Sequence, residues 1–327
     1  MSDPIPQTTK LQEAQMPDII LHHFNTSPYA EKIRLILGYK NLAWKSVLVP
    51  NIMPKPLYTA LTGGYRRVPV MQIGADVYCD TALIAAEIER RFPAKPIMRS
   101  GAADFTNPLI SWHDNYLFWK VARYVIGKNA GAISDDFLRD RAKMMRLDLT
   151  PEANRAKGVA EAPHMLSQLH IALGWLDDAL ATTGFVSGNA LSYADFAMVP
   201  SIWFLTTRVS DAPAMVESQF PRLADWLKRV SAAGYGTREE ISGEAALAIA
   251  REGTAEMMAH GEAKSDEATG ISVGDKVAIT PESFGTEAVS GVVAAISAQC
   301  VTLHWNGAEV GDVAIHFPRL GYAINKA

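Results

Sequence analysis

The stretch that most constrains the fold of this chain covers residues 66–86, RRVPVMQIGADVYCDTALIAA. Residues 68–73 are apolar and β-prone, residues 74–76 form a turn, and Val77 begins a second short strand. Asp80 and Thr81 then stand where an apolar helical period begins. These features predict two short strands joined by a tight turn and followed at once by a helix.

Pro69 gives the first of these strands a special character. Proline has no N–H to donate, so a strand that opens Val-Pro is either a sheet edge or a special loop. One such loop contains a cis X-Pro bond, which leaves a backbone edge open to an extended ligand. Asp80 or Thr81 adds a polar side chain and free N–H groups at a helix start, which suit a carboxylate. The stretch therefore predicts a site for a short, peptide-like, anionic ligand.

The preceding residues supply the rest of an α/β unit. Residues 19–24 are typical of a buried strand, Pro28 fits the first position of a helix that ends near residue 40, and residues 44–49 are a second strand. The order β-α-β, loop, β-β-α predicts a thioredoxin-like α/β domain over residues 18–94. Residues 1–17 lack the apolar core and cleavage pattern of a signal peptide and are expected to be a mobile tail.

The remainder predicts two further domains. Apolar residues recur at helical spacing from residue 103 to about 258, so an all-helical bundle is expected over residues 102–258. Residues 259–270 are polar and small and predict a linker. Residues 271–327 hold short alternating strands, with Asn306-Gly307 as a hairpin turn, and predict a small all-β barrel of the SH3 type.

Composition excludes several classes of protein. A net charge of −4 gives no general affinity for nucleic acid or an anionic membrane, and no apolar run approaches the ~18 residues of a membrane span. The two cysteines, Cys79 and Cys300, exclude a disulfide framework and a cysteine zinc site and fit a reducing cytoplasm. His22 and His23 point to opposite faces of a strand, so no metal site is predicted.

Four segments in this order, SPYAEKIRLIL after the first strand, VPV, YCDTALI and SYADF, carry a family resemblance. Over residues 18–258 the chain resembles the glutathione transferase family. The resemblance implies that fold (an α/β thioredoxin-like domain plus an all-α helical bundle domain), glutathione as co-substrate, a cytoplasmic homodimer and a role in detoxification. The C-terminal β domain has no counterpart in that plan.

The resemblance also implies roles for individual residues. Ser27 resembles the catalytic serine of the tau class, and Thr26 matches the serine position of delta-like members. Implied glutathione-binding residues are Lys55, Arg67, Val68, Pro69, Asp80 and Thr81. Among these, the Val68 backbone would pair with the cysteinyl part, Asp80 and Thr81 with the γ-glutamyl end, and Lys55 with the glycine carboxylate. Residues 61–67 replace the family's common Asn-Pro loop, so the role of Arg67 stays open.

The acceptor side of the implied site lies on the first helix of the second domain. The candidates for the acceptor pocket are Tyr29, Trp112, Tyr116, Trp119 and Arg123. An aromatic stripe at helical spacing is more often core than pocket. Tyr116 and Arg123 carry polar groups, which a side chain that only fills the core would not need. The resemblance implies that a hydrophobic electrophile binds here.

Three functional hypotheses follow. The first is a transferase, because a hydroxyl that donates to sulfur and the positive end of a helix dipole both favour the nucleophilic thiolate. The alternative is that Ser27 only caps the helix, which the accompanying motifs disfavour. The second is a non-catalytic scaffold that uses the β domain to engage a partner. The third is a glutathione-dependent isomerase or ether-cleaving enzyme. With no cysteine near the end of the first strand, an omega-type reductase is disfavoured.

Overall fold

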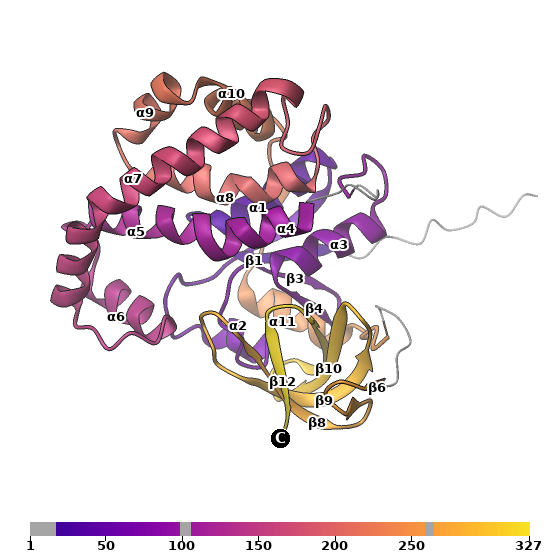
Figure 1. Ribbon diagram of the computed structural model, residues 1–327. Helices are drawn as coiled ribbons and strands as arrows, with labels where there is room; N and C mark the ends of the chain where they lie inside the picture. Colours follow the sequence, from indigo (N-terminus) through magenta and orange to yellow (C-terminus); the bar gives the residue numbers. More distant parts are fainter. Residues whose placement is uncertain (1–17, 99–105, 259–264) are drawn as a thin grey trace, which may run out of the picture.

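The computed structural model describes residues 18–98, 106–258 and 265–327 of the chain. The predicted tail at residues 1–17 and half of the predicted linker, residues 259–264, lie outside the described residues. An N-terminal α/β part occupies the middle of the molecule, with a group of helices on one side and C-terminal strands on the other (Figure 1). The α/β domain and the helical domain confirm the predicted fold class.

The N-terminal domain follows the predicted order of elements. It contains β1 (Ile19–His23), α1 (Pro28–Tyr39), β2 (Ala43–Leu48), α2 (Pro56–Leu61), β3 (Val70–Ile73), β4 (Asp76–Cys79) and α3 (Thr81–Arg91). Strand β1 pairs in parallel with β2 and antiparallel with β3, and β3 pairs antiparallel with β4. Both faces of β1 are buried, which explains its unbroken apolar run.

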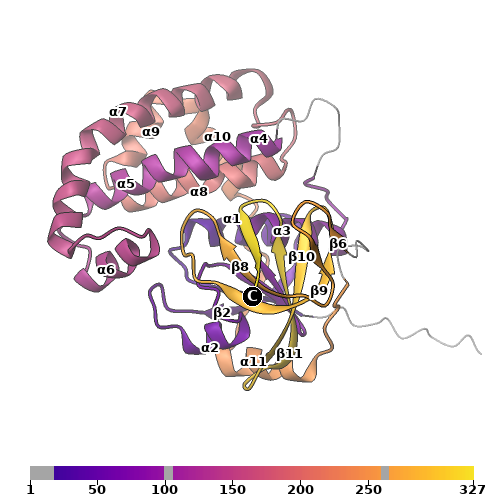
Figure 2. The same ribbon diagram turned by 60° about the horizontal axis from the view of Figure 1, so that its bottom comes forward.

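The second part of the chain is a helical bundle. Its elements are α4 (Thr106–Trp112), the π-helical turn η1 (His113–Leu117), α5 (Phe118–Lys128), α6 (Asp135–Met144), α7 (Pro151–Thr183), α8 (Tyr193–Arg208), α9 (Ala212–Gln219) and α10 (Pro221–Ser231). Figure 2 shows these helices gathered on one side of the N-terminal domain. Helix α8 begins with a capping box, in which the Asp195 carboxylate accepts from the backbone N–H of Ser192 at 2.9 Å.

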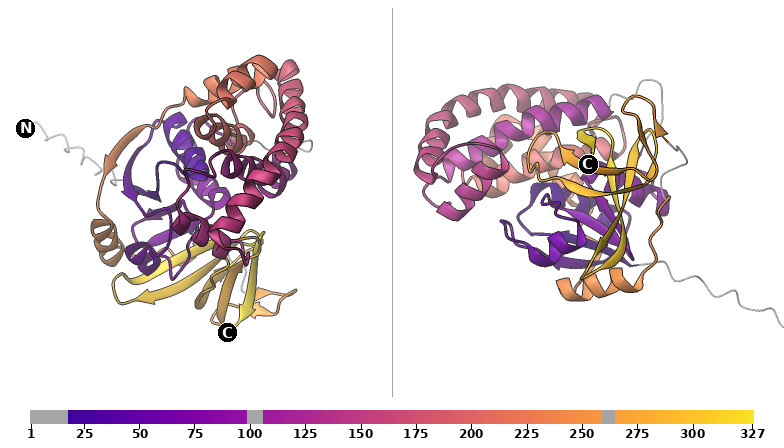
Figure 3. Two further views of the ribbon diagram at one scale, coloured as in Figure 1. Left: turned by 90° about the vertical axis from the view of Figure 1, so that its left-hand side faces the viewer. Right: turned by 90° about the horizontal axis from the view of Figure 1, so that it is seen from below.

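The prediction that the chain stays helical to residue 258 is wrong for β5 (Thr237–Glu240). Gly234 and Gly236 both adopt positive φ after α10, which turns the chain out of the helix. Strand β5 then pairs in parallel with β2 at the edge of the sheet. Helix α11 (Gly243–Glu252) follows and packs against α2, on the side of the N-terminal domain that faces away from the helical bundle (Figure 3).

The C-terminal part begins with the short pair β6 (Ser265–Asp266) and β7 (Ile271–Ser272), so the predicted linker does not extend unstructured to residue 270. Five strands follow: β8 (Lys276–Pro281), β9 (Val289–Ile296), β10 (Cys300–Gly307), β11 (Gly311–Pro318) and β12 (Tyr322–Lys326). The hairpin between β10 and β11 is present, but its turn is at 308–310, one step beyond Asn306-Gly307. Gly311, with φ 71°, supplies the left-handed residue that a three-residue hairpin loop needs.

The C-terminal strands join the N-terminal sheet. Strand β11 pairs in parallel with β4, giving one ten-stranded sheet in the order β12-β8-β9-β10-β11-β4-β3-β1-β2-β5. Among the described strands no pairing between β12 and β11 closes a barrel, and the SH3-like part of the prediction is not confirmed. The edge of β4 is therefore covered by this chain's own third domain.

Two apolar cores follow from the alternation of side chains along the strands. Leu21 of β1 belongs to the core that continues into the helical bundle. Its neighbour Ile20 points to the opposite face and joins a second core that contains Val77, Leu303 and Phe317. The C-terminal strands thus share a hydrophobic core with the N-terminal domain.

Within the described ranges, no helix combines the length and apolar character that crossing a membrane requires. The same residues contain no cluster of three or more His, Cys, Asp or Glu side chains placed to hold a metal ion. Both cysteines are free and buried, and burial raises the pKa of each thiol, that of Cys300 to about 12.

Candidate functional site

Strand register brings the three main candidate segments to the same end of three neighbouring strands, β1, β3 and β4. His22 near the end of β1 lies opposite Val70 at the start of β3, and Val70 lies opposite Cys79 at the end of β4. The residues that continue from these positions are therefore neighbours: Ser27 after β1, Val68 before β3, and Asp80 after β4. Three segments that are far apart in the sequence therefore meet the sheet at the same end of neighbouring strands.

Ser27 is the N-cap of α1. Its Oγ accepts a hydrogen bond from the backbone N–H of Ala30 at 3.2 Å, and its side chain is buried. A hydroxyl has one donor in addition to its acceptor lone pairs, so capping leaves the Ser27 O–H available to donate. Pro28 follows at the first helical position, and Thr26 lies exposed in the preceding turn.

Val68 and Pro69 form the predicted special loop. The peptide bond between them is cis, as is that between Met53 and Pro54, which sequence reasoning missed. Strand β3 begins only at Val70. Within the described residues no backbone hydrogen bond reaches Val68, so its N–H and C=O remain available at the sheet edge.

Asp80 is the N-cap of α3. Its φ of 74° lies in the left-handed region, which is uncommon for a residue other than glycine and is concentrated at functional sites. One carboxylate oxygen accepts from the N–H of Ala82 at 2.9 Å, and the other accepts from the Tyr322 hydroxyl at 3.1 Å. Asp80 thus combines a negative charge with a fixed orientation at the helix start.

Thr81 links the two helix starts through Lys32. The fully buried Lys32 ammonium, just over one turn into α1, donates to Thr81 Oγ1 at 2.9 Å. The N-termini of α1 and α3 therefore lie together, and their positive dipole ends share one region. Sequence reasoning missed Lys32, although a lysine inside the apolar run of α1 was a visible signal.

A buried polar network continues from Lys32 into the helical domain. Burial opposes ionisation of Asp114, but nearby Lys32 and a hydrogen bond from His113 outweigh it and lower the pKa of that carboxyl. Burial lowers the pKa of His113. His113 is therefore neutral, and its Nδ1–H donates to Asp114 at 2.8 Å while Nε2 accepts from Ser201. The π-helical turn η1 places both residues at the junction of the two domains.

Lys55 is buried, and its ammonium donates to the carbonyl oxygen of Arg66 at 3.2 Å. Burial, together with the positive charges of Arg141 and Arg66, lowers the pKa of Lys55 to about 8. The side chain lies near the rings of Phe24 and Tyr58. A lysine in this setting gains from an anionic partner, which would offset its desolvation.

The two arginines of the central stretch have different partners. Arg66 is buried and forms ion pairs with Asp140 of α6 at 2.6 Å and with Glu287 of the third domain at 2.9 Å. Arg67 donates to the carbonyl oxygen of Phe284, and its guanidinium lies 3.9 Å from the centre of the Phe284 ring. Arg67, a predicted glutathione-binding residue, is thus held by the third domain.

Sequence reasoning missed two residues that the third domain brings to this region. Tyr322 of β12 donates to Asp80 and shares a hydrogen bond of 2.8 Å with the Tyr65 hydroxyl. Phe284 lies in the loop between β8 and β9 and contacts Arg67. An aromatic residue inside the polar sequence ESFGTE was a signal for Phe284, whereas nothing local marks Tyr322.

Two of the five acceptor-pocket candidates lie at the junction between domains. The ring of Tyr29 packs on Phe118 with centroids 4.7 Å apart, and its hydroxyl donates to Asp114 at 3.2 Å. Trp119, the next residue after Phe118, meets Phe284 edge to face at 5.1 Å. These rings form one aromatic wall beside Arg67.

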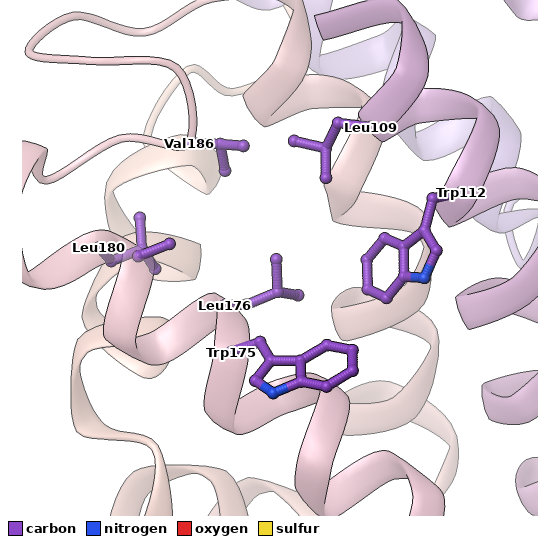
Figure 4. Close-up of a pocket in the computed structure, with 7 residues that line it drawn as sticks. Leu109, Trp112, Trp175, Leu176, Leu180 and Val186 are labelled. Carbon is purple, nitrogen blue, oxygen red and sulfur yellow. The ribbon is translucent and has the colours of Figure 1, made fainter. Parts of the chain in front are cut away.

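The structure does not bring the other three candidates to this wall. Trp112 lines an apolar cavity of about 240 Å³ between α4 and α7, where its ring lies beside that of Trp175 (Figure 4). Tyr116 is exposed beside Trp112, with ring centroids 6.2 Å apart. Arg123 is half exposed on α5 and pairs with Glu161. Contact with the aromatic wall is therefore limited to Tyr29 and Trp119.

Comparison with known proteins identifies the family. The family model for the N-terminal domain of glutathione S-transferase matches residues 21–96, and the model for its C-terminal domain matches residues 152–229. No curated protein matches the chain. Among solved structures, a GST-like protein from Pseudomonas syringae is 34% identical, with a TM-score of 0.72, and the match covers 95% of this chain and 100% of that chain.

Two further structures match over part of the chain. A glutathione S-transferase from Rhodospirillum rubrum is 19% identical, with a TM-score of 0.49, over 65% of this chain and 87% of its own. A tau class glutathione S-transferase from mango is 19% identical, with a TM-score of 0.47, over 66% of this chain and 89% of its own. The Pseudomonas match, which includes the C-terminal strands, carries the conclusion: the chain belongs to the glutathione S-transferase family.

Proposed function

We propose that this protein is a glutathione transferase, which activates the glutathione thiol for attack on an electrophilic, largely apolar small molecule. The observation that supports it most is the convergence of Ser27, Val68 and Asp80 at one sheet edge, with the starts of α1 and α3 tied together by Lys32. To bind glutathione, a site needs a hydrogen-bond donor for the sulfur, backbone groups that pair with the peptide and a charged group for the amino end. Ser27, Val68 and Asp80 would supply these in that order.

Each candidate residue would contact a different part of bound glutathione. The free N–H and C=O of Val68, next to Pro69, would pair with the cysteinyl backbone. The γ-glutamyl end would meet the Asp80 carboxylate and Thr81. Each oxygen of Asp80 accepts one bond within the protein, which leaves lone pairs for an ammonium group. The glycine carboxylate would meet Lys55, and Arg67 adds positive charge nearby.

Ser27 is the residue proposed to act on sulfur. Its hydroxyl can donate to the thiolate while its lone pair keeps the α1 cap, and the helix dipole favours the negative charge. Because a free thiol of pKa ~8.5 is only a few per cent ionised at pH 7, stabilising the anion raises the fraction that reacts. Thr26 is the alternative donor, although it lies exposed in the turn.

Substitution of Ser27 tests the proposal. Ser27→Ala is expected to lower kcat/KM toward chlorodinitrobenzene about 10- to 100-fold, equivalent to ~1.4–2.8 kcal/mol of transition-state stabilisation, with the glutathione Kd changed little. Thr26→Ala is the matched control and should retain activity. Equal activity of wild type and Ser27→Ala would reduce Ser27 to a helix cap, and loss of activity in Thr26→Ala alone would transfer the role to Thr26.

A second candidate function is a non-catalytic scaffold. It is favoured by the third domain, which engages two predicted glutathione-binding residues, Asp80 through Tyr322 and Arg67 through Phe284. Retention on glutathione resin without turnover of any electrophile would support this reading. A glutathione-dependent isomerase or ether-cleaving enzyme would use the same thiolate, and a panel of substrates separates it from a transferase.

The proposal extends to the compartment and the oligomeric state of the protein. We place the protein in the cytoplasm, where detoxification of electrophiles would be its role and its two buried thiols would stay reduced. A homodimer is expected, and the exposed rings of Tyr116 and Trp175 offer apolar surface for a second copy.

A further inference from the structure

The loop between β8 and β9, residues 282–288, touches both other domains. On the N-terminal side, Arg67 Nε donates to the Phe284 carbonyl oxygen at 2.8 Å and Arg66 pairs with Glu287 at 2.9 Å. On the helical side, the N–H of Gly285 donates to the carbonyl oxygen of Met144, the last residue of α6, at 2.8 Å. The loop therefore crosses from one domain to the other beside the candidate site.

Arg146 adds a fourth anchor, because its Nε donates to Thr286 Oγ1 at 2.8 Å. Gly285 has a φ of 55°, and a Cβ there would lie 3.3 Å from Arg66 Cγ and 3.4 Å from Arg67 Cγ, so the loop backbone packs closely on the arginine pair. These four anchors use backbone groups and polar or charged side chains. None of the four involves the Phe284 ring, so they would remain when that ring is replaced.

The ring of Phe284 points between the two domains. One face lies 3.9 Å from the guanidinium carbon of Arg67, the residue before Val68. Trp119 of α5 meets the same ring at 5.1 Å with an interplanar angle of 76°. Phe284 as a residue is only partly buried.

We propose that Phe284 is the side chain that limits the size of the electrophile accepted by this protein. It places an apolar ring against the guanidinium of Arg67, the residue before Val68, and against Trp119 on the acceptor side. The third domain then supplies one wall of the acceptor site. This inference rests on the proposed function, since it requires glutathione at the Val68 edge.

Equilibrium binding of S-substituted glutathiones tests the inference without requiring turnover. Calorimetry would compare glutathione with its S-methyl, S-benzyl and S-naphthylmethyl derivatives on wild type and on the Ala, Leu and Trp variants at Phe284. The matched control is Leu320→Ala, which removes an exposed apolar side chain from the same domain. Thermal unfolding of each variant checks its fold.

Phe284→Ala is expected to leave the Kd for glutathione and S-methylglutathione within about twofold of wild type and to lower the Kd for S-naphthylmethylglutathione about tenfold. For the same bulky ligand, Phe284→Leu should give a Kd between those of Phe284→Ala and wild type, and Phe284→Trp should bind it more weakly than wild type. Leu320→Ala should match wild type throughout. If every Phe284 variant still binds glutathione and the ratio of the S-naphthylmethylglutathione Kd to the glutathione Kd is the same in all of them, the size-limiting role alone would be overturned. Failure of wild type to bind glutathione or any derivative would overturn the proposed function and this inference together.

Discussion

At the scale of single residues, the site depends on charges held in buried surroundings. Lys32 is fully buried and reaches Thr81, and Asp114 lies close enough for its pKa to be lowered by that ammonium. For Lys55, burial and the charges of Arg141 and Arg66 outweigh the nearby Asp140 carboxylate and lower the pKa to about 8. Lys32 and Lys55 thus place two buried ammonium groups in the region, where an anionic peptide would offset their desolvation.

The pKa of Lys55 leads to a pH prediction for binding. The ammonium is mostly charged at pH 7 and mostly neutral at pH 9, so its contribution to holding a carboxylate disappears across that window. The ratio of the S-methylglutathione Kd of Lys55→Met to that of wild type should therefore fall about tenfold between pH 7 and 9. S-methylglutathione is used because it has no thiol to titrate. A ratio that does not change with pH would remove Lys55 from the binding site.

The same substitution has a consequence for stability. Between pH 8 and 10.5 the unfolded chain holds the Lys55 proton more tightly than the folded chain does, so stability contributed by this group rises with pH there. In Lys55→Met the free energy of unfolding should not show this increase from pH 8 to pH 10, which urea titrations at the two pH values would measure. Lys228→Met, at a well-exposed position, is the control and should keep it.

At the scale of elements, the close crossing of α5 and α7 holds the helical side of the site. Gly127 of α5 faces Gly158 of α7, and a Cβ at Gly127 would overlap the Gly158 carbonyl oxygen and lie 2.9 Å from Ala162 Cβ. Gly127→Ala should therefore lower the free energy of unfolding by about 2 kcal/mol. Gly174→Ala on α7 meets only Phe220 at 3.9 Å and should raise it by about 0.5 kcal/mol.

Denaturant titrations of the two alanine variants check this difference. Equal stability of both would mean that α5 and α7 separate easily, and Trp119 and Phe118 on α5 would then be poorly fixed as a wall.

Local patterns in the sequence were enough to predict the N-terminal elements. The apolar run of β1, the Pro28 start of α1 and the Val-Pro strand each have a signal within a few residues. Strand β5 has no such signal, because residues 237–240 are polar and become a strand only by pairing with β2. The parallel pairing of β11 with β4 joins segments more than 200 residues apart, and no local pattern specifies it.

The same distinction applies to the site. Ser27, Val68 and Asp80 lie in motifs that could be read from the chain, and strand register brings them together. Phe284 and Tyr322 reach the site only because the third domain folds against the first. Their roles therefore follow from tertiary contacts, which a single sequence does not reveal.

At the scale of the whole molecule, the third domain is part of the N-terminal fold. It extends the sheet at β4, shares a core with Ile20 and Val77, and places a buried hydrogen bond of 2.8 Å between His316 and Asp76 at the junction. An exposed β4 edge would otherwise be free to pair with other chains. We therefore expect the first and third domains to unfold in one cooperative transition.

Proline substitutions in the β10–β11 hairpin test this coupling. The N–H of Ala314 donates to the carbonyl oxygen of Ala75, and Ala314→Pro removes that bond, so the free energy of unfolding should fall by about 3 kcal/mol. Ala308→Pro, in the turn of the same hairpin, should have a small effect. Two separate transitions in wild type, or equal effects of the two variants, would contradict the coupling.

The central claim is that glutathione binds with its sulfur held as an anion by Ser27, and the ionisation of bound glutathione tests it most directly. Difference absorbance of the thiolate, followed against pH, gives the pKa of the bound thiol in wild type and in Ser27→Ala. We expect a pKa at least about one unit below the ordinary ~8.5 in wild type and a return toward that value in Ser27→Ala. A bound thiol that titrates at the ordinary value in both proteins would contradict it.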